Sequence, residues 1–525
     1  MTLLDQLLEG QKMADLKAPG VYIVEHDSLP NSVVAVQTAI PAFIGCTEKA
    51  ALGSESLIGN PTKITSLDDY HTLFGTAPDL METVVYTPAI APAPFATVLI
   101  DPVKRSFFYS SIRLFFSNGG GTCYIVSVNT IADTIAAGGV NSIALDDLCK
   151  DALTALEKER DVTMVVVPDA VGAGIDAWAN ICSYAVQHCI KLQSRIGIFD
   201  VVHGDQPRDH SDASDVISGA NGFRARINAD GDGLNYGVAY YPWLNTSLRE
   251  AADVDFTWLT KDGIGHLVTD LLAEADADPR LASTPQTLTK LKGVINSICS
   301  LKPGPDATTA HQVLLIKSVS YRQLMLDMLA VANVVPPSGA MAGVYARVDS
   351  DLGVFCAPAN VSITCAVSPT VPISDEEQGD LNTPIDGKAV NAIRVIPQHG
   401  LVVWGARTLL GNSQDWRYIN VRRTMIMLEQ SIKLAVEGFV FHPNTSVTWV
   451  SVKSTIVNFL TARWQEGALV GATAEDAFSV DVGLGSTMTA TDIFDGYMNV
   501  TVRVAATHPA EFIELAFQQQ LQKSE

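Results

Sequence analysis

The sequence is poor in charged residues and has no long apolar run. Charged residues make up 18% of its 525 positions and hydrophobic residues 47%, whereas average proteins carry about 25% charged residues. Such a surface suits a protein covered by partners, although an ordinary large soluble protein of modest polarity is the alternative. No apolar stretch approaches the roughly 18 to 20 residues that span a membrane. Asp5 and Glu9 stand where a secretory leader is basic and apolar, so we expect synthesis in the cytoplasm and no membrane insertion.

The cysteines lack the spacing that metal sites and disulfide frameworks require. Eight cysteines are scattered along the chain without a CxxC pair. We therefore expect reduced thiols, no zinc site and no bound cofactor.

Basic residues are also scarce, and the excess of acidic over basic residues is unevenly distributed along the chain. The chain has 35 basic and 57 acidic residues, a net charge of −22. Because nucleic-acid binding needs clustered lysine and arginine, this balance argues against it. Residues 385–525 contain 11 basic and 13 acidic residues, so nearly all the acidity lies in residues 1–384. This split is typical of a solvent-facing front part and a partner-covered C-terminal part, although chance composition can also produce it.

A β-α-β unit is the clearest structural signal in the front part. Strands over 162–167 and 196–202 flank a helix over 175–192 whose apolar positions recur every three or four residues. This pattern predicts parallel pairing with a right-handed crossover, and hence an α/β layer domain. Further strands are predicted over 123–128 and 236–241. The chain then reads as mostly helical over 247–333, turn-rich over 336–363, and as a polar linker over 374–388.

The last 140 residues predict an α+β domain in which two helices cover a sheet. A strand over 401–404 precedes two helices with apolar stripes over 418–439 and 449–459, and a half-buried strand follows over 500–504. Two short apolar strands are also predicted at the chain ends, as arms that could leave their own domain. They contain Val21, Tyr22, Ile23 and Val24 after a Pro-Gly pair, and Ile513, Leu515 and Phe517 after a His-Pro pair. The first 18 or so residues read as a short amphipathic or loose segment.

Two loops contain residue types that are typical of catalytic or metal-binding sites, but the sequence does not support a site in either loop. Residues 203–210 place two histidines and two aspartates after a strand, where α/β enzymes hold catalytic groups, but such loops are commonly polar. Residues 228–239 imitate the start of a calcium loop, yet alanine stands where the bidentate carboxylate is needed. The glycines at 119–121 precede a strand, whereas a phosphate loop needs them before a helix. We expect no enzymatic activity; an α/β enzyme using the 203–210 loop is the alternative.

Eight segments stand out when the sequence is read as a whole. They are APGVYIVEHDSLPNSVVAVQTAIPAFIG, FFSNGGGTCYIVSV, VVVPDA, YYPWL, PPSGAMAGVYARVD, GVFCAPAN, GLVVWGARTL and WRYINVRR. Together these segments resemble the contractile tail-sheath family of myophages, R-type bacteriocins and extracellular contractile injection systems. They occur in family order over residues 18–425, and residues 245–307 match nothing.

The resemblance implies a multidomain α/β and α+β fold with a discontinuous inner sheath domain and an inserted outer α/β domain. On this reading residues 1–30 are an N-terminal arm joining the inner domain, and residues 31–380 are the outer region, with 245–307 as an extra insertion. Residues 381–510 are then the inner domain and residues 511–525 the C-terminal arm. The arms would add strands to sheets of neighbouring subunits.

The resemblance also implies a structural role. Subunits would form a helical homopolymer of stacked rings, with or without sheath paralogues, around an inner tube and between a baseplate and a terminator or cap. Contraction of the metastable extended sheath would drive the tube through a target envelope, within a particle assembled in the cytoplasm. A static shell or tube protein is the alternative, and the type of particle stays open.

A net positive charge over residues 413–463 suggests a surface for an acidic tube. Arg422, Arg423 and Lys453 are the candidate tube-facing residues. Internal or sheath-sheath ion pairs are the alternative use of these cations.

Overall fold

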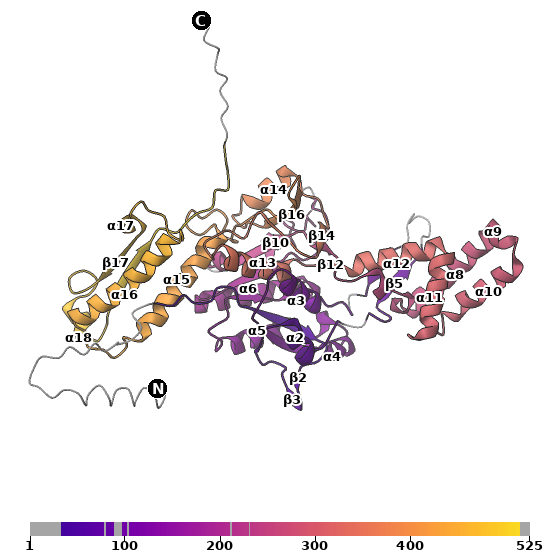
Figure 1. Ribbon diagram of the computed structural model, residues 1–525, viewed down its shortest axis with the longest axis horizontal. Coiled ribbons are helices and arrows are strands. Elements are labelled where there is room, and N and C mark those ends of the chain that lie inside the picture. The colour runs from indigo at the N-terminus through magenta and orange to yellow at the C-terminus, as the bar shows by residue number, and fades with distance from the viewer. Residues whose placement is uncertain are drawn as a thin grey trace, which may run out of the picture.

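The chain forms an elongated molecule of three units (Figure 1). The computed structural model describes residues 33–77, 80–88, 97–101, 104–209, 213–229 and 231–514. A central unit carries the largest sheet, a helical unit lies at one end of the molecule, and a C-terminal unit lies at the other. Some predicted arm residues lie outside the described residues: Val21, Tyr22, Ile23, Val24, Leu515 and Phe517.

A nine-stranded sheet organises the central unit, in the order β13-β16-β15-β10-β9-β8-β1-β7-β4. The six strands from β15 to β7 are parallel, and the flanking strands are antiparallel. Strands β1, β9 and β10 are buried along their whole length, as expected for parallel strands covered on both faces. In sheet order the bounds are Val361–Ser362, Gly400–Val403, Asn391–Ile396, Gly237–Tyr241, Ile196–Asp200, Met164–Val166, Pro41–Thr47, Cys123–Thr130 and Thr62–Ile64.

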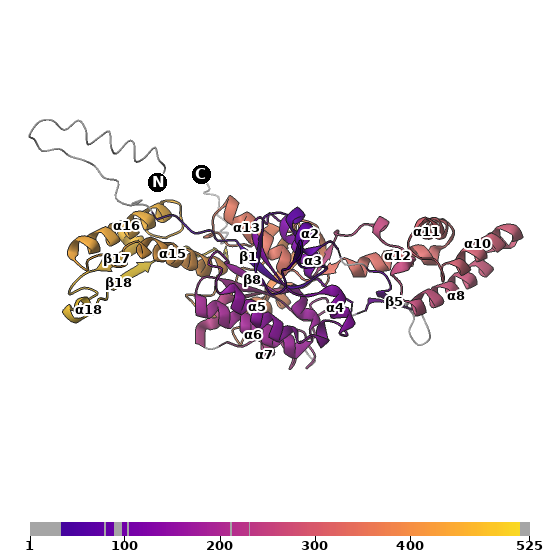
Figure 2. The same ribbon diagram turned by 90° about the horizontal axis from the view of Figure 1, so that it is seen from below.

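Helices cover both faces of this sheet. Figure 2 shows α3 (Phe108–Ser117) and α13 (Ser338–Asp351) on one side and α5 (Leu145–Leu156) and α6 (Ile175–Leu192) on the other. The predicted β-α-β unit is confirmed as β8, α6 and β9, with parallel pairing of the two strands.

The prediction of a turn-rich stretch over 336–363 is wrong for Ser338–Asp351, which form the buried helix α13, whereas residues 352–360 do form turns and bends. Its small residues allow close packing against α3 instead of forming turns. A Cβ atom added at Gly339 or Gly343 would collide with the backbone carbonyl of Ser111 or Phe115 on α3. The glycines therefore mark a helix-helix contact.

The helical unit has its own hydrophobic core. The mostly helical reading of 247–333 is confirmed by α8 (Lys261–Ala277), α9 (Pro279–Ala282), α10 (Pro285–Ser297), α11 (Pro305–Lys317) and α12 (Val319–Ala332). The hairpin of β5 (Val84–Thr87) and β6 (Thr97–Ile100) contributes Val84 and Ile100 to this core from a distant part of the chain. The unit therefore extends beyond the expected insertion at 245–307.

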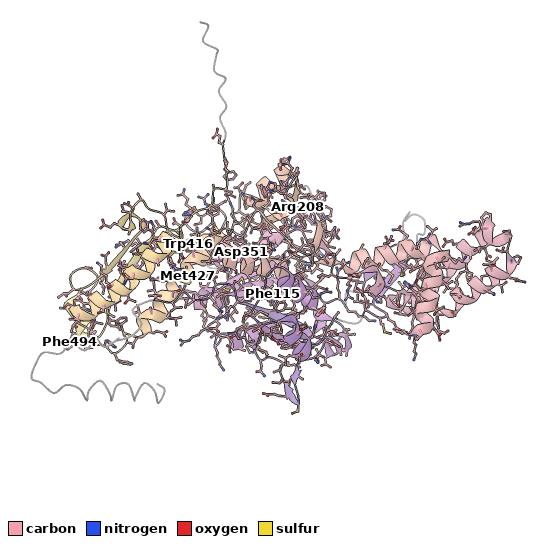
Figure 3. All side chains as sticks on the ribbon, in the orientation of Figure 1. Phe115, Arg208, Asp351, Trp416, Met427 and Phe494 are labelled. Carbon is pink, nitrogen blue, oxygen red and sulfur yellow. The ribbon has the colours of Figure 1, made fainter. Side chains whose placement is uncertain are left out.

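The C-terminal unit packs helices on a two-stranded antiparallel sheet, as the apolar stripes predict. It contains α15 (Ile419–Glu437), α16 (Ser446–Gln465), α17 (Ala474–Ala477), β17 (Phe478–Val482), α18 (Ala490–Phe494) and β18 (Val500–Val504). Helix α15 joins two cores: Ile419 and Ile426 are buried in the central unit, whereas Met427 and Leu428 are buried in the C-terminal unit. Figure 3 labels Met427 where the two units meet.

The expected start of an inner domain at residue 381 does not coincide with a break in the fold. Strands β15 and β16 follow that residue and continue the central sheet, so the C-terminal unit separates only along α15. The supposed polar linker over 374–388 contains α14 (Asp375–Asn382), which begins with a capping box between Ser374 and Glu377.

Smaller elements complete the described structure. No helix within it is long and apolar enough to cross a membrane. The elements are α2 (Leu67–Phe74), α4 (Ile131–Ala136), α7 (Phe223–Arg226), β2 (Ala51–Leu52), β3 (Glu55–Ser56), β11 (Leu244–Thr246), β12 (Val334–Val335) and β14 (Ala366–Pro369).

Candidate functional site

The first described residues are fastened to the body by a buried ion pair. Arg423 on α15 donates two hydrogen bonds to the carboxylate of Asp349, at 2.7 and 2.6 Å, and a third at 3.0 Å to the backbone carbonyl of Thr38. The Thr38 hydroxyl donates to the same carboxylate. Val36 adds a backbone hydrogen bond to the Ser431 hydroxyl at 3.1 Å. The chain therefore leaves the body towards residue 33 at a fixed place along α15.

The surroundings of Arg423 explain why a cation can be buried there. Burial alone would lower the pKa of Arg423, but the Asp349 carboxylate raises it above its usual range. The guanidinium also lies over the ring of Tyr345, 4.7 Å from its centroid, and the Tyr345 hydroxyl hydrogen-bonds to that of Tyr240. Removing one partner would leave an uncompensated buried charge.

Arg422 and Arg423 do not lie on an exposed face, so the expectation that they contact a tube is wrong in its placement. Each is only 4% exposed. Arg422 pairs with Glu429 at 3.2 Å and lies against the rings of Trp416 and Tyr236. These cations serve internal pairs, which is the alternative that the sequence left open. Lys453, on α16, is exposed and can still meet a partner.

The last described residues are fastened by a second arginine. The Glu511 carboxylate accepts hydrogen bonds from Arg407 Nε at 2.9 Å and Arg407 Nη2 at 2.6 Å. It accepts two more from the Tyr418 hydroxyl at 2.9 Å and the Asn382 amide at 2.5 Å. Burial by itself would raise the pKa of Glu511, but the hydrogen bonds from Arg407 and its neighbours hold the pKa below its usual range. Two residues later, Ile513 is 79% exposed, so the anchored segment points its next side chains outwards.

A groove of about 460 Å³ lies beside this anchor. Its walls come from α14, from the end of β16 and from the C-terminal segment itself, including Trp404 and Phe512. Sequence reasoning found Ile513 but missed Glu511. The signal was an acid directly before an apolar strand pattern, which spacing alone could not connect to Arg407 more than a hundred residues earlier.

The two-stranded sheet β17–β18 is the natural acceptor for an added strand. Its register runs from Phe478 opposite Val504 to Val482 opposite Val500. Within the described part of the chain, each of these strands pairs only with the other. Their outer edges therefore present backbone N–H and C=O groups that another strand can use.

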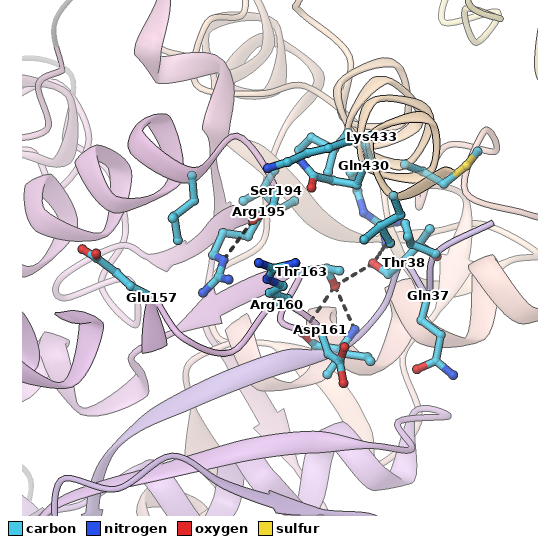
Figure 4. A pocket seen from close by; sticks show the side chains of 18 of the residues that line it. Gln37, Thr38, Glu157, Arg160, Asp161, Thr163, Ser194, Arg195, Gln430 and Lys433 are labelled. Atoms are coloured by element: carbon cyan, nitrogen blue, oxygen red, sulfur yellow. Dashed lines mark hydrogen bonds between the residues drawn. The ribbon is translucent and has the colours of Figure 1, made fainter. Parts of the chain in front are cut away.

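A second groove, of about 640 Å³, separates α15 from the central unit (Figure 4). Gln430 and Lys433 of α15 lie across from Arg160, Ser194 and Arg195. Most of its charges have partners: Arg160 faces Glu437 at 3.7 Å, and Arg195 is buried and donates to the backbone carbonyls of residues 156 and 159. The groove thus lies beside the contact between the central and C-terminal units, and most of the charged side chains that line it are paired.

The loop over 203–210 is organised by a structural network. The Arg208 side chain is 1% exposed and pairs with Asp215 at 3.1 Å and Asp380 at 2.6 Å. The exposed His203 and the nearby Asp205 lie outside these pairs, and His210 lies outside the described residues. The loop is thus tied to α14 by an arginine that the sequence reading overlooked.

The calcium-like stretch is also explained by the fold. Residues 231–236 form a 3-10 helix that leads directly into β10, where a calcium loop would continue to a twelfth-position ligand. In the part of the chain that the structure describes, no three His, Cys, Asp or Glu side chains gather as a metal site.

A buried carboxylate with a perturbed pKa occurs at the end of β9. Burial raises the pKa of Asp200 to about 7, against hydrogen bonds donated by the Ser338 backbone and hydroxyl. These bonds fix the start of α13 on the sheet, which gives Asp200 a structural role.

Comparisons with known proteins agree with this architecture. Residues 412–520 match the family model of the phage tail sheath C-terminal domain. The chain is similar to a protein of the helical sheath of the anti-feeding prophage in its contracted state, with 26% identity, 96% of this chain and 99% of that chain covered, and a TM-score of 0.59. It is similar to a protein of the contracted sheath complex of the extracellular contractile injection system PVC, with 27% identity, coverage of 96% and 98%, and a TM-score of 0.57.

A third similar structure is a chain of the anti-feeding prophage baseplate, with 26% identity, coverage of 96% and 99%, and a TM-score of 0.58. No curated protein sequence matches. The resemblance to contractile tail sheaths and the multidomain α/β and α+β fold class are thereby confirmed.

Proposed function

From its tail-sheath architecture, we propose that this chain is the structural subunit of a contractile sheath. It polymerises around an inner tube, and contraction drives the tube through a target envelope. The observation that carries this proposal is similarity over 96% of the chain to proteins of two different contracted sheaths. Both the central unit and the inserted helical unit are included in that coverage, so the proposal does not rest on one shared domain.

The anchored chain ends give this function a physical basis. Residues 21–24 and 513–517 act as arms that add strands to the β17–β18 sheets of neighbouring subunits. Buried pairs at Arg423 and Arg407 fix the points from which the arms leave. The open edges of β17 and β18 accept them. Each subunit is then linked to others through backbone hydrogen bonds that survive a change of packing.

Helix α15 lets each subunit move as one body. It spans two hydrophobic cores without interruption, because its first half is buried in the central unit and its second half in the C-terminal unit. Displacement of the C-terminal unit is therefore transmitted to the central unit. The work of contraction comes from the lower free energy of the contracted packing, and the subunit needs no cofactor.

The partners follow from this role. The chain associates with itself as a helical polymer of stacked rings, with an inner tube, and with a baseplate and a terminator or cap at the ends. The C-terminal unit faces the tube, with Lys453 among its exposed cations, and the helical unit faces outwards. Assembly takes place in the cytoplasm as part of a phage tail-like particle.

Electron microscopy of purified particles tests the proposal. Long and short sheath states of different diameter are expected, and a single fixed geometry would indicate a static shell. A variant lacking residues 515–525 should keep its circular dichroism spectrum but fail to form the polymer. The matched control is Ile316→Ser, which changes an exposed side chain of the helical unit and should assemble normally. Normal assembly of the truncated chain would refute the role of the C-terminal arm.

A further inference from the structure

An exposed apolar surface lies at the far end of the C-terminal unit, where the α15–α16 loop meets α18. Figure 3 labels Phe494 at this end, opposite the helical unit. Phe494 is 90% exposed and Phe441 fully exposed. We name this surface the distal corner and define it by Val440, Phe441, Val447, Val450, Phe494 and Tyr497.

The distal corner is a built feature of the fold. Asn444 ties its parts together, because its amide donates to the Tyr497 carbonyl at 2.9 Å and accepts from the Trp449 indole at 2.7 Å. Phe441 has φ of 69°, a left-handed backbone conformation that is rare for an aromatic residue. The loop thus holds an aromatic ring in solvent at a conformational cost, which is typical of a surface that is covered in the working assembly.

The first ten residues contain a complementary apolar face. Leu3 and Leu7 are four positions apart, as are Leu4 and Leu8. On a helix these four leucines form one stripe, with the acidic and amide side chains of the segment on the other side.

The same segment carries a helix-start signal that this chain uses elsewhere. Helix α17 begins with a capping box between Thr473 and Asp476, and α18 begins with another Thr-x-x-Asp box. Thr2 and Asp5 repeat this spacing, with the first leucine of each pair between them. Gly10 then stands where a helix commonly ends. A helix this short is marginal alone in water, so it needs a surface on which to order.

We propose that residues 2–9 of a second copy form a short amphipathic helix that docks its four leucines on the distal corner. This rests on the proposed function, in which residues 21–24 join the β17–β18 sheet of a neighbour. Helix α18 lies between β17 and β18 in the chain, so the corner adjoins that sheet. The ten residues between Gly10 and Val21 span up to about 33 Å when extended, so the N-terminal segment can extend well beyond the added strand. The N-terminus is then a second, apolar fastening beyond the strand.

Cysteine cross-linking in the assembled full-length chain tests this contact. The variant Leu7→Cys with Phe494→Cys is made in a Cys299→Ser background, because Cys299 is the exposed thiol among the described cysteines. Mild oxidation of the polymer should give a ladder of linked chains, and the unpolymerised chain should give none. The control pairs Leu7→Cys with Ile316→Cys on the exposed surface of the helical unit. A ladder no stronger than in this control, or the same link within the unpolymerised chain, would overturn the proposal.

Thiol labelling of Phe494→Cys in the polymer gives an independent test. The cysteine should react at least tenfold more slowly with the leucines present than when all four are changed to serine. Equal rates would overturn the proposal and leave an inner-tube subunit or solvent as what meets the corner. A polymer without the link contradicts this contact alone. A full-length chain that forms no polymer contradicts the proposed function, and this inference with it.

Discussion

Replacement of Glu511 by alanine should release the C-terminal arm without unfolding the rest of the protein. The Glu511 carboxylate is the polar anchor of a segment whose next residues, Phe512 and Ile513, are largely exposed. It receives four hydrogen bonds from three residues of the body. Without it, little holds residues 509–514 against the end of the central sheet, and the arm loses its fixed point of departure.

The size of the effect follows from these contacts. A hydrogen bond to a charged group contributes roughly 1.5–3 kcal/mol, but bonds that share one carboxylate are not additive. Arg407 would also keep its hydrogen bonds to the carbonyls of Asn382 and Gly411. We therefore expect Glu511→Ala to cost about 3 kcal/mol locally, which makes opening of the segment roughly a hundredfold more frequent.

Amide hydrogen exchange measured on peptides covering residues 505–514 is the direct assay. Glu511→Ala should raise exchange there by one to two orders of magnitude and leave β1 and β9 unchanged. Glu514→Ala is the matched control, since it removes an exposed acid three residues later. Exchange in Glu511→Ala within threefold of the control would refute the anchoring role, and assembly of the variant into polymer should be impaired in proportion to the release.

Three further predictions concern stability. The pKa of Glu511 is depressed in the folded protein, so the stability that Glu511 gives to the attached C-terminal segment is fully present above about pH 4.3, the pKa of an unfolded glutamate. That stability is lost as pH falls through the folded pKa. Exchange of the C-terminal segment should therefore rise only in acid. Arg423→Glu should place two buried carboxylates together and lower the free energy of unfolding by at least about 3–5 kcal/mol, giving little folded protein by circular dichroism. Lys453→Glu, in contrast, should fold normally, so that its assembly alone tests the tube-facing surface. Gly343→Ala should lower the melting temperature, because overpacking costs about 1–3 kcal/mol, while Gly293→Ala, in open space on α10, should raise stability by up to about 1 kcal/mol.

Periodicity predicted the parts of the fold whose patterns are local. The unit β8, α6 and β9 was predictable because the chain alternates between apolar runs and a helical stripe within about 40 residues. The helices α15 and α16 were predictable for the same reason. The β5–β6 hairpin was not, because its membership of the helical unit depends on contacts with residues more than 150 positions later. Helix α13 was missed because glycine and alanine serve close packing there, and composition alone reads them as turns.

The location of the candidate site along the chain was predictable from the sequence, but the contacts of its residues were not. The sequence predicts apolar strands at both chain ends, which stay a prediction, and Ile513 is exposed just beyond an anchor. It assigned Arg422 and Arg423 to a surface because a count of charges does not show burial. Their partners Glu429 and Asp349 become apparent only in three dimensions. The decisive residues Arg407 and Glu511 are separated by 104 positions, a distance at which no local pattern connects two side chains.

The use of ion pairs at both anchors is consistent with a need for geometry more than for stability. Apolar residues of similar volume could bind a chain segment to the body as strongly as a buried pair does, since burying charges is itself costly. Apolar contacts, however, allow a strand to slide. Arg423 and Asp349 together hold Thr38 of the first described segment, because the guanidinium donates to the Thr38 carbonyl and the Thr38 hydroxyl donates to the Asp349 carboxylate. Arg407 holds Glu511 of the last described segment through a two-pronged pairing. A polymer linked by exchanged strands needs each arm to start from a fixed position, because a slip of one residue in an arm would turn every side chain of the added strand to the wrong face.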